Sequence, residues 1–209
     1  MGKTGTKFEA HSSLARFPSS SRNWTNAEII EGIIGRSAVA GQALFEKYNP
    51  HISARVRRLM GPDAEWEDLV QQIFLALITA IADVREPKLL DRWVDRITVN
   101  AVRKEFRRRR RRWYLSYVPE LPETIDLPER DGTLLFHRTA SVLSTMHPDE
   151  RIAFVLRFVV EEEIAPIAEM CGWSISTTKR RINKARDNFI KRAQRDPMLH
   201  SIMEGVSNE

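Results

Sequence analysis

Apolar residues recur at intervals of three and four through most of the 209-residue chain, which is the spacing of amphipathic α-helices. The most regular run predicts a helix whose core-facing side holds Trp66, Leu69, Val70, Ile73, Phe74, Leu77, Ile78 and Ile81. Further helices are predicted over residues 25–36, 39–48, 51–60, 134–145 and 148–160. No segment shows the two-residue alternation of a half-buried strand, so the pattern predicts an all-α fold.

Helix-start signals support these assignments. Thr25 and Glu28 have the spacing of a capping box, and Asp63 can cap the helix that follows the Gly61-Pro62 break. Pro148 occupies a first helical position with two acidic residues directly after it, which suits the positive end of a helix dipole. We therefore expect helices to begin near these residues.

The polar face of the helix over residues 63–81 contains one residue that does not fit a solvated surface. Asp68, Gln71 and Gln72 lie on that face together with Leu75. A single exposed leucine has no functional meaning by itself. Among these polar neighbours on one helical face, it favours a protein-binding stripe.

Six consecutive arginines, residues 107–112, follow a segment whose polar positions are already basic. Such a block is usually a solvated, disordered tail. On a helical wheel, however, the polar positions fall within an arc of roughly 80°, opposite an apolar side that includes Leu90, Val94 and Ile97. We therefore expect one amphipathic helix with a basic stripe made by Arg92, Arg96, Asn100, Arg103, Arg107 and Arg110.

The segment IAPIAEMCGWSISTTKRRINKARDNF, residues 164–189, has the spacing of a helix-turn-helix motif, with Gly172 at the turn and Ser174 as a cap. A buried stripe is expected at Ile175, Thr178, Ile182, Ala185 and Phe189. The second helix of such a motif enters the major groove of DNA. Its candidate DNA contacts are Ser176, Thr177, Lys179, Arg180, Arg181 and Lys184, with Arg180 the best placed to bind guanine.

Charge is segregated along the chain, although the net charge is only +5. Residues 92–112 hold ten Lys or Arg against two acids, and residues 174–195 hold eight against one. Two basic faces indicate a polyanionic partner. Between them lies an acidic, proline-containing segment typical of an extended linker, at most ~70 Å long. The predicted organisation is two small helical domains, with a flexible arm (1–24), the first domain (25–112), the linker (113–133), the second domain (134–196) and a tail (197–209).

Signals for catalysis, metal binding and membrane insertion are weak. The five histidines show no ligand spacing to one another or to the single cysteine, and there is no glycine-rich phosphate loop or serine elbow. Cys171 is expected as a small core residue, and a lone cysteine fits a reducing compartment. The longest apolar run is too short to cross a bilayer. The sequence favours a soluble, cytoplasmic protein that is not an enzyme and needs no cofactor.

Two parts of the chain resemble the extracytoplasmic-function sigma factors of bacteria. DAEWEDLVQQIFLAL (63–77) followed by DRWVDRITVNAVRKEFRRRRRR (91–112) is similar to their second conserved region, and IAEMCGWSISTTKRRINKAR (167–186) is similar to their fourth. The resemblance covers residues 39–112 and 134–193. It implies a transcription initiation subunit that binds core RNA polymerase, recognises promoters and helps to open DNA.

The resemblance also implies roles for individual residues. Asp68, Gln71, Gln72 and Leu75 would contact the clamp helices of the largest polymerase subunit, and the fourth region would contact the flap of the second largest. Residues 176–184 would read the minus-thirty-five element. Reading and melting of the minus-ten element would fall to Arg92, Trp93, Arg96, Asn100, Arg103 and Arg107. Trp93 has a second interpretation, because it borders the apolar face and packing in the core is favoured. Thr178 departs from the family pattern at a usually apolar position.

Other functions use the same residues differently. A stand-alone helix-turn-helix regulator would use the stripe at residues 68–75 as a dimer face. An enzyme acting on DNA would need a serine or tyrosine nucleophile among arginines, which nothing in the sequence favours. The resemblance leaves open whether an anti-sigma factor covers the basic surfaces.

Overall fold

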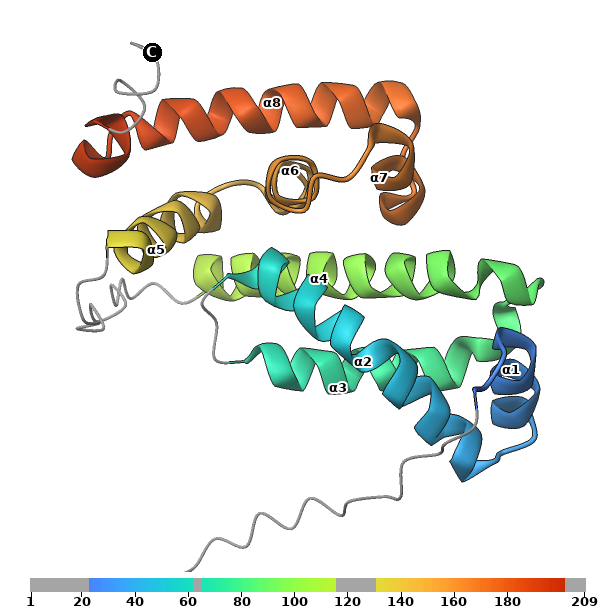
Figure 1. Cartoon of the computed structure of the whole chain (residues 1–209). Helices are drawn as coiled ribbons and strands as arrows, with labels where there is room; N and C mark the ends of the chain where they lie inside the picture. Colours follow the sequence, from blue (N-terminus) through green and yellow to red (C-terminus); the bar gives the residue numbers. More distant parts are fainter. Residues whose placement is uncertain (1–22, 62–64, 116–130, 202–209) are drawn as a thin grey trace, which may run out of the picture.

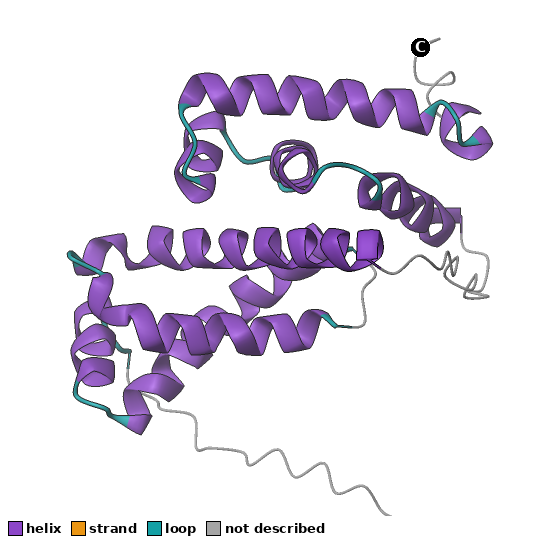
Figure 2. Cartoon of the chain, turned by 180° about the vertical axis from the view of Figure 1, so that it is seen from behind, coloured by secondary structure: helices purple, strands orange, loops and turns teal. Residues whose placement is uncertain are grey.

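The computed structural model describes residues 23–61, 65–115 and 131–201, and within these ranges it contains helices and turns but no strand (Figure 2). The helices form two stacked layers (Figure 1). The first comprises α1 (Asn26–Ile34), α2 (Ala38–Met60), α3 (Trp66–Ala80) and α4 (Leu90–Leu115). The second comprises α5 (Asp131–Ser144), α6 (Pro148–Phe154), α7 (Ile164–Cys171) and α8 (Ile175–Ala193). The prediction of an all-α fold is confirmed for the described residues.

Three short turns connect or extend these helices. Two 3-10 turns, η1 (Ile81–Asp83) and η2 (Pro87–Leu89), join α3 to α4. The last part of the helix predicted over 148–160 widens into a π-helical turn, η3 (Val155–Val159). At the start of α1 the predicted capping box is confirmed, because Thr25 N–H donates to the Glu28 carboxylate at 2.9 Å and the Thr25 hydroxyl accepts from Glu28 N–H.

Helix α2 corrects the prediction of two helices over 39–48 and 51–60. It is one 23-residue helix with Pro50 inside it. A proline in a helix interior costs about 3 kcal/mol, because it removes a backbone hydrogen bond and its ring clashes with the preceding turn. Buried apolar residues on both sides of Pro50 share one face, and their burial outweighs that cost; they include Leu44, Tyr48, Ile52 and Val56.

Helix α3 buries most of the predicted face. Leu69, Val70, Ile73, Phe74 and Leu77 are buried, and Ile81 follows them into the core. The prediction for Ile78 was wrong, since this side chain is 44% exposed near the end of the helix. The proposed cap, Asp63, lies outside the described residues.

The arginine run belongs to α4, which continues to Leu115 as one helix. The prediction of a structured surface in place of a loose tail is therefore confirmed. Trp93, Val94, Val99, Val102 and Phe106 form its buried side. Helices α4 and α5 also extend into the two ends of the predicted linker, whose residues 116–130 lie outside the described part.

The two layers pack directly against each other. Helix α4 contacts α6 and α7 (Figure 1), and one cluster of buried apolar side chains includes residues of both layers, such as Val102 and Met170. Helix α2 also contacts the second layer: the side chain of Arg55 pairs with Glu162 at 3.0 Å, and Arg151 on α6 donates to the backbone carbonyl of Met60 at 2.6 Å. The sequence suggested two modules acting at separate places, whereas the structure holds them together.

Candidate nucleic-acid and polymerase interface

The helix-turn-helix predicted from the sequence is formed by α7, Gly172 and α8. Gly172 adopts a left-handed backbone conformation, with φ of 65°, that ends α7. The Ser174 hydroxyl accepts a hydrogen bond from Thr177 N–H at 3.2 Å and so caps α8. These two residues fix the angle between the helices, because each ends or begins one of them.

Thr178, the polar residue at a usually apolar position, is fully buried in α8. Its hydroxyl donates to the backbone carbonyl of Ser174 at 3.0 Å, so the buried polar group is satisfied within the helix. Ile182 and Ala185 are buried as predicted, and Phe189 is half-buried. The prediction for Ile175 was wrong, because this first residue of the helix is 46% exposed.

The opposite face of α8 holds the predicted DNA contacts. Ser176, Lys179, Arg180 and Lys184 are exposed, whereas Thr177 and Arg181 are half-buried. Lys184 pairs with Glu150 of α6 at 2.7 Å. Lys179 and Arg180 extend from the first turns of the helix, which is where major-groove readers contact base edges.

Most residues of the predicted basic stripe of α4 are open to solvent, and one of them packs against the second layer. Arg92, Arg96, Asn100 and Arg107 are exposed, while Arg103 is half-buried and faces the second layer. Trp93 is only 7% exposed and belongs to the core. The burial of Trp93 agrees with the packing interpretation, and its contact with promoter bases stays a prediction.

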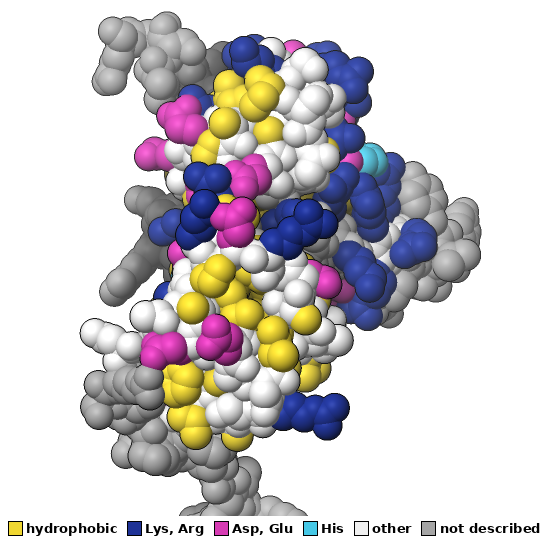
Figure 3. Space-filling model, turned by 90° about the vertical axis from the view of Figure 1, so that its right-hand side faces the viewer, with side chains coloured by type: hydrophobic (Ala, Val, Ile, Leu, Met, Phe, Trp, Pro, Cys, Tyr) yellow, Lys and Arg dark blue, Asp and Glu magenta, His cyan; other side chains and the backbone are white. Residues whose placement is uncertain are grey.

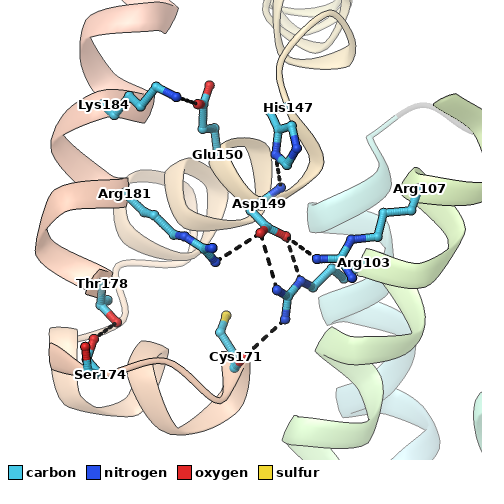
Figure 4. Close-up of polar contacts among 10 residues, drawn as sticks. All are labelled: Arg103, Arg107, His147, Asp149, Glu150, Cys171, Ser174, Thr178, Arg181 and Lys184. Atoms are coloured by element: carbon cyan, nitrogen blue, oxygen red, sulfur yellow. Dashed lines mark hydrogen bonds and ion pairs between the residues drawn. The ribbon is translucent and has the colours of Figure 1, made fainter. Parts of the chain in front are cut away.

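Asp149, in the first turn of α6, joins the two basic faces (Figure 4). Its carboxylate is 8% exposed and accepts hydrogen bonds from Arg103 at 2.6 and 3.3 Å and from Arg107 at 3.1 Å. Arg181 of α8 completes the group with an ion pair at 3.0 Å, whose alignment falls short of a hydrogen bond. Three residues predicted to bind DNA, from two domains, therefore share one acidic partner.

The electrostatics of this cluster favour the ionised carboxylate. Burial alone would raise the pKa of Asp149. The hydrogen bond from Arg103 and the charges of Arg103, Arg181 and Arg107 outweigh burial, so the pKa lies below the usual range of an aspartate. The carboxylate is consequently charged at all pH values near neutrality.

Two further groups complete the contact between α4 and the helix-turn-helix. The indole of Trp173 lies beside two guanidinium groups, 5.2 Å from Arg103 and 4.1 Å from Arg181. Arg103 also donates to the backbone carbonyl of Cys171 at 3.2 Å (Figure 4). Cys171 is buried, as predicted, and burial raises the pKa of its thiol to about 12, which leaves it unreactive.

The arginine run also pairs within the first layer. Arg108 and Arg109 both donate to Glu105 at 2.7 Å, and Arg109 reaches Glu65 before α3 at 2.9 Å. Burial tends to raise the pKa of Glu105, but the bonds and charges of the two arginines lower it overall. Neighbouring arginines thus point in different directions: Arg107 faces the second layer, whereas Arg108 and Arg109 hold α4 to the segment before α3.

Sequence reasoning missed Asp149, Glu105 and Trp173 as parts of the site. Asp149 was assigned only a helix-dipole role, and nothing in periodicity indicates that an acid 42 to 46 residues beyond an arginine will contact it. The one available signal was the buried-face position of Glu105, an acid inside a basic helix. Its i+3 and i+4 neighbours are both arginines, which is the spacing of helical ion pairs.

A groove of about 620 Å³ lies beside the Asp149 carboxylate and its arginines, and it is lined mainly by cationic residues. Its lining comprises Asn100, Arg103, Lys104, Arg107, Arg110, Arg111, His147 and Pro148. Burial lowers the pKa of His147, and the charges of Arg110 and Lys184 act in the same direction against those of Asp149 and Glu150. A groove with this lining suits a chain of phosphates.

The predicted polymerase-binding stripe lies on the outer face of α3. Asp68, Gln71, Gln72 and Leu75 are all exposed, and Leu75 is 66% exposed. Ile78 and Phe45 of α2 are also exposed large apolar residues, and the Phe45 ring lies 4.8 Å from that of Phe74. In the space-filling view, hydrophobic side chains gather on the first layer, and Lys and Arg gather where the layers meet (Figure 3).

The described residues offer neither a metal site nor a membrane-spanning helix. Among those residues, no group of three or more His, Cys, Asp or Glu is arranged to hold a metal ion. Within the same part of the chain, no helix is both long and apolar enough to span a membrane.

The two layers correspond to two regions of one protein class. Residues 44–112 match the sigma-70 region 2 family, and residues 137–188 match the sigma-70 region 4 family. The order of the regions is that of an RNA polymerase sigma factor.

Relatives identify the branch of that class. The chain is 28% identical over 143 residues to the ECF RNA polymerase sigma factor EcfG of Rhodopseudomonas palustris, an alignment of 67% of this chain and 77% of that protein. It is 25% identical to the sigma factor CnrH of Cupriavidus metallidurans, over 77% of this chain and 93% of that protein.

Two solved complexes share the fold. CnrH bound to the cytosolic domain of CnrY matches with a TM-score of 0.53 and 21% identity, over 80% of this chain and 96% of that one. The sigma factor RpoE bound to the anti-sigma factor NepR, from Bartonella quintana, matches with a TM-score of 0.55 and 22% identity, over 74% and 97%. The two sigma-70 regions and the ECF sigma factor relatives show that the chain belongs to the ECF sigma factor family.

Proposed function

We propose that this chain binds core RNA polymerase through the outer face of α3 and then places α8 and α4 on the two promoter elements. The observation that carries the proposal is the α3 face, where Leu75 is 66% exposed among polar residues. A lone DNA-binding regulator would use the same face to form a dimer, so the partner of this face separates the two functions. The chain acts by binding, as a cytoplasmic transcription initiation subunit, and performs no covalent step.

Upstream recognition is assigned to α8. Its exposed first turns present Ser176, Lys179 and Arg180, and the fork of an arginine matches the two acceptors on the major-groove edge of guanine. Lys184 and Arg181 lie further along the helix, where phosphate contacts set its position on the duplex. Each would first leave the acidic partner that it has on α6.

Downstream recognition and melting are assigned to α4. Arg92, Arg96 and Asn100 form an exposed row on one side, and Arg103 and Arg107 continue it. Cationic residues in a row track a phosphate backbone, and the contact weakens with salt because bound counterions are released. We expect Arg103→Ala and Arg107→Ala to weaken promoter opening in a salt-dependent way, with a larger loss of promoter affinity at low salt than at high salt.

Run-off transcription with purified core polymerase on a library of genomic fragments tests the proposal. The chain should start RNA synthesis at a small set of sites, and the free chain should select those sites poorly without polymerase. A chain that neither co-purifies with core polymerase nor starts synthesis on any template would contradict the proposal. The molecular mass of the free chain in solution distinguishes a sigma factor from a stand-alone regulator, because the regulator requires a dimer through residues 68–75.

Regulation by an anti-sigma factor is a proposal of the same kind. Both solved complexes named above contain a sigma factor with a second protein, and the one with NepR names it an anti-sigma factor. Such a partner for this chain would compete with polymerase for α3 or with DNA for the basic faces. Co-purification from the native cell, followed by identification of the bound protein, tests for it.

A further inference from the structure

The basic residues of both domains meet at one place in the free chain. Arg103 and Arg107 come from α4, which is assigned to the downstream element, and Arg181 comes from α8, which is assigned to the upstream element. All three lie within 3.1 Å of an oxygen of the Asp149 carboxylate (Figure 4). One edge of each basic face is therefore held against the other domain, although the two faces are assigned to separate promoter elements.

The carboxylate makes the contacts that a DNA phosphate would make. A guanidinium binds a carboxylate or a phosphate through the same paired N–H donors. Arg103 uses two of its nitrogens for the two oxygens of Asp149. Because the same donors cannot serve two anions at full strength, DNA and Asp149 compete for these arginines.

The surroundings hold the edges of the two basic faces in direct contact. The Trp173 ring lies beside the guanidiniums of both Arg103 and Arg181, and Arg103 also reaches the carbonyl of Cys171. A major groove about 12 Å wide admits one helix at a time. Arg103 and Arg181 can therefore reach DNA in separate grooves only after they leave Asp149 and the two domains move apart.

A second contact holds the domains together at a distance from the DNA-binding residues. Arg55 of α2 is 8% exposed as a residue and pairs with Glu162, which precedes α7, at 3.0 Å. Its other terminal nitrogen lies 2.8 Å from the sulfur of Met170. Neither Arg55 nor Glu162 belongs to the surfaces assigned to DNA or polymerase. A substitution in this pair therefore changes the contact between the two domains without removing a DNA or polymerase contact.

We propose that Asp149 acts as an internal substitute for a DNA phosphate and locks the free chain in a closed form that cannot engage both promoter elements. This inference rests on the proposed function, since it concerns the same arginines. Both promoter elements are bound only by the open fraction of molecules, so the apparent affinity of the free chain for promoter DNA falls by that fraction. Removing the charge of Asp149 raises the open fraction.

Asp149→Asn keeps the shape of the side chain and removes its charge. Spin labels at Ala76→Cys on α3 and Lys191→Cys on α8 report the distance between the domains, while the buried Cys171 stays unlabelled. The wild-type chain should give one short distance, and Asp149→Asn should add a longer one. We expect the affinity of the labelled free chain for promoter fragments to rise at least about tenfold.

Two variants make this test specific. Glu150→Gln is the matched control, because Glu150 is also a buried first-turn acid of α6 but contacts Lys184 and Asn188 of its own domain. Its distance distribution should stay as in the wild type. Glu162→Gln breaks the Arg55 pair without touching a DNA contact, and it should lengthen the distance and tighten DNA binding in the same direction as Asp149→Asn.

The possible outcomes separate this inference from the proposed function. Wild-type distances in both Asp149→Asn and Glu162→Gln, or opening without tighter DNA binding, would overturn the lock even if the chain supports transcription. Failure of the wild type in run-off transcription would overturn the proposed function, whereas the distances would still decide whether the chain is closed. If Asp149→Asn loses its helical circular dichroism, Glu162→Gln decides the question.

Discussion

Leu75→Ala should weaken binding to core polymerase without weakening the fold. Leu75 is 66% exposed on α3, so the protein core loses little when its side chain is shortened. A polymerase surface that covers it would bury roughly three methylene-sized groups, each worth about 0.8 kcal/mol. Scaled by the fraction still exposed in the free chain, the loss is about 1.5 kcal/mol, or roughly tenfold in affinity.

The assay is a competition measurement in which unlabelled variants displace labelled wild-type chain from core polymerase. Ile34→Ala is a matched control, because Ile34 is 56% exposed at the end of α1, outside the α3 stripe. It should compete as well as the wild type. Equal competition by Leu75→Ala and wild type, with unchanged thermal midpoints in both, would refute the assignment of α3 as the polymerase-binding face.

Three other predictions follow from single residues. Arg180→Ala should cost about 1–3 kcal/mol of discrimination at one base pair of the upstream element, measured by competition between point-substituted promoters in the presence of core polymerase; equal loss on all sequences would indicate a phosphate contact instead. Gly172→Ala should lower the stability by about 1 kcal/mol, read as a drop in thermal midpoint, because its φ of 65° strains any side chain while no atom crowds the added carbon. His147 has a lowered pKa, so its contribution to stability is complete above the ordinary histidine pKa and declines as the pH falls through the folded value. His147→Asn, which keeps a side-chain acceptor, should therefore flatten the fall in thermal midpoint between pH 7 and pH 5, and an unchanged slope would contradict the sign.

The helices and their caps were predictable because they depend on neighbours within one turn. The Thr25 capping box, Ser174 at the start of α8 and the helical arginine run all follow from spacing alone. Pro50 misled the prediction, since its local cost is offset by burial that only the whole face of α2 reveals. Ile78 and Ile175 lie near helix ends. There the apolar face of the helix is longer than the part that neighbouring helices cover, so both side chains are exposed.

The relation between the domains was not predictable from periodicity. It depends on contacts such as Arg103 with Asp149 and Arg55 with Glu162, which join residues 46 and 107 positions apart. A basic stripe looks the same in sequence whether its partner is DNA or an acid in the same chain. Composition could identify the basic faces, but only three-dimensional packing could show that one carboxylate binds arginines of both.

The place of Trp173 gives the molecule an optical reporter of its own. Its indole lies against Arg103 and Arg181, and its ring nitrogen is buried with no hydrogen-bond partner among the described residues. Separation of the layers would admit water to that nitrogen and remove both cations from the ring. The emission of this tryptophan should then move to longer wavelength, and comparison with Trp173→Phe separates that shift from the emission of the other four tryptophans of the chain.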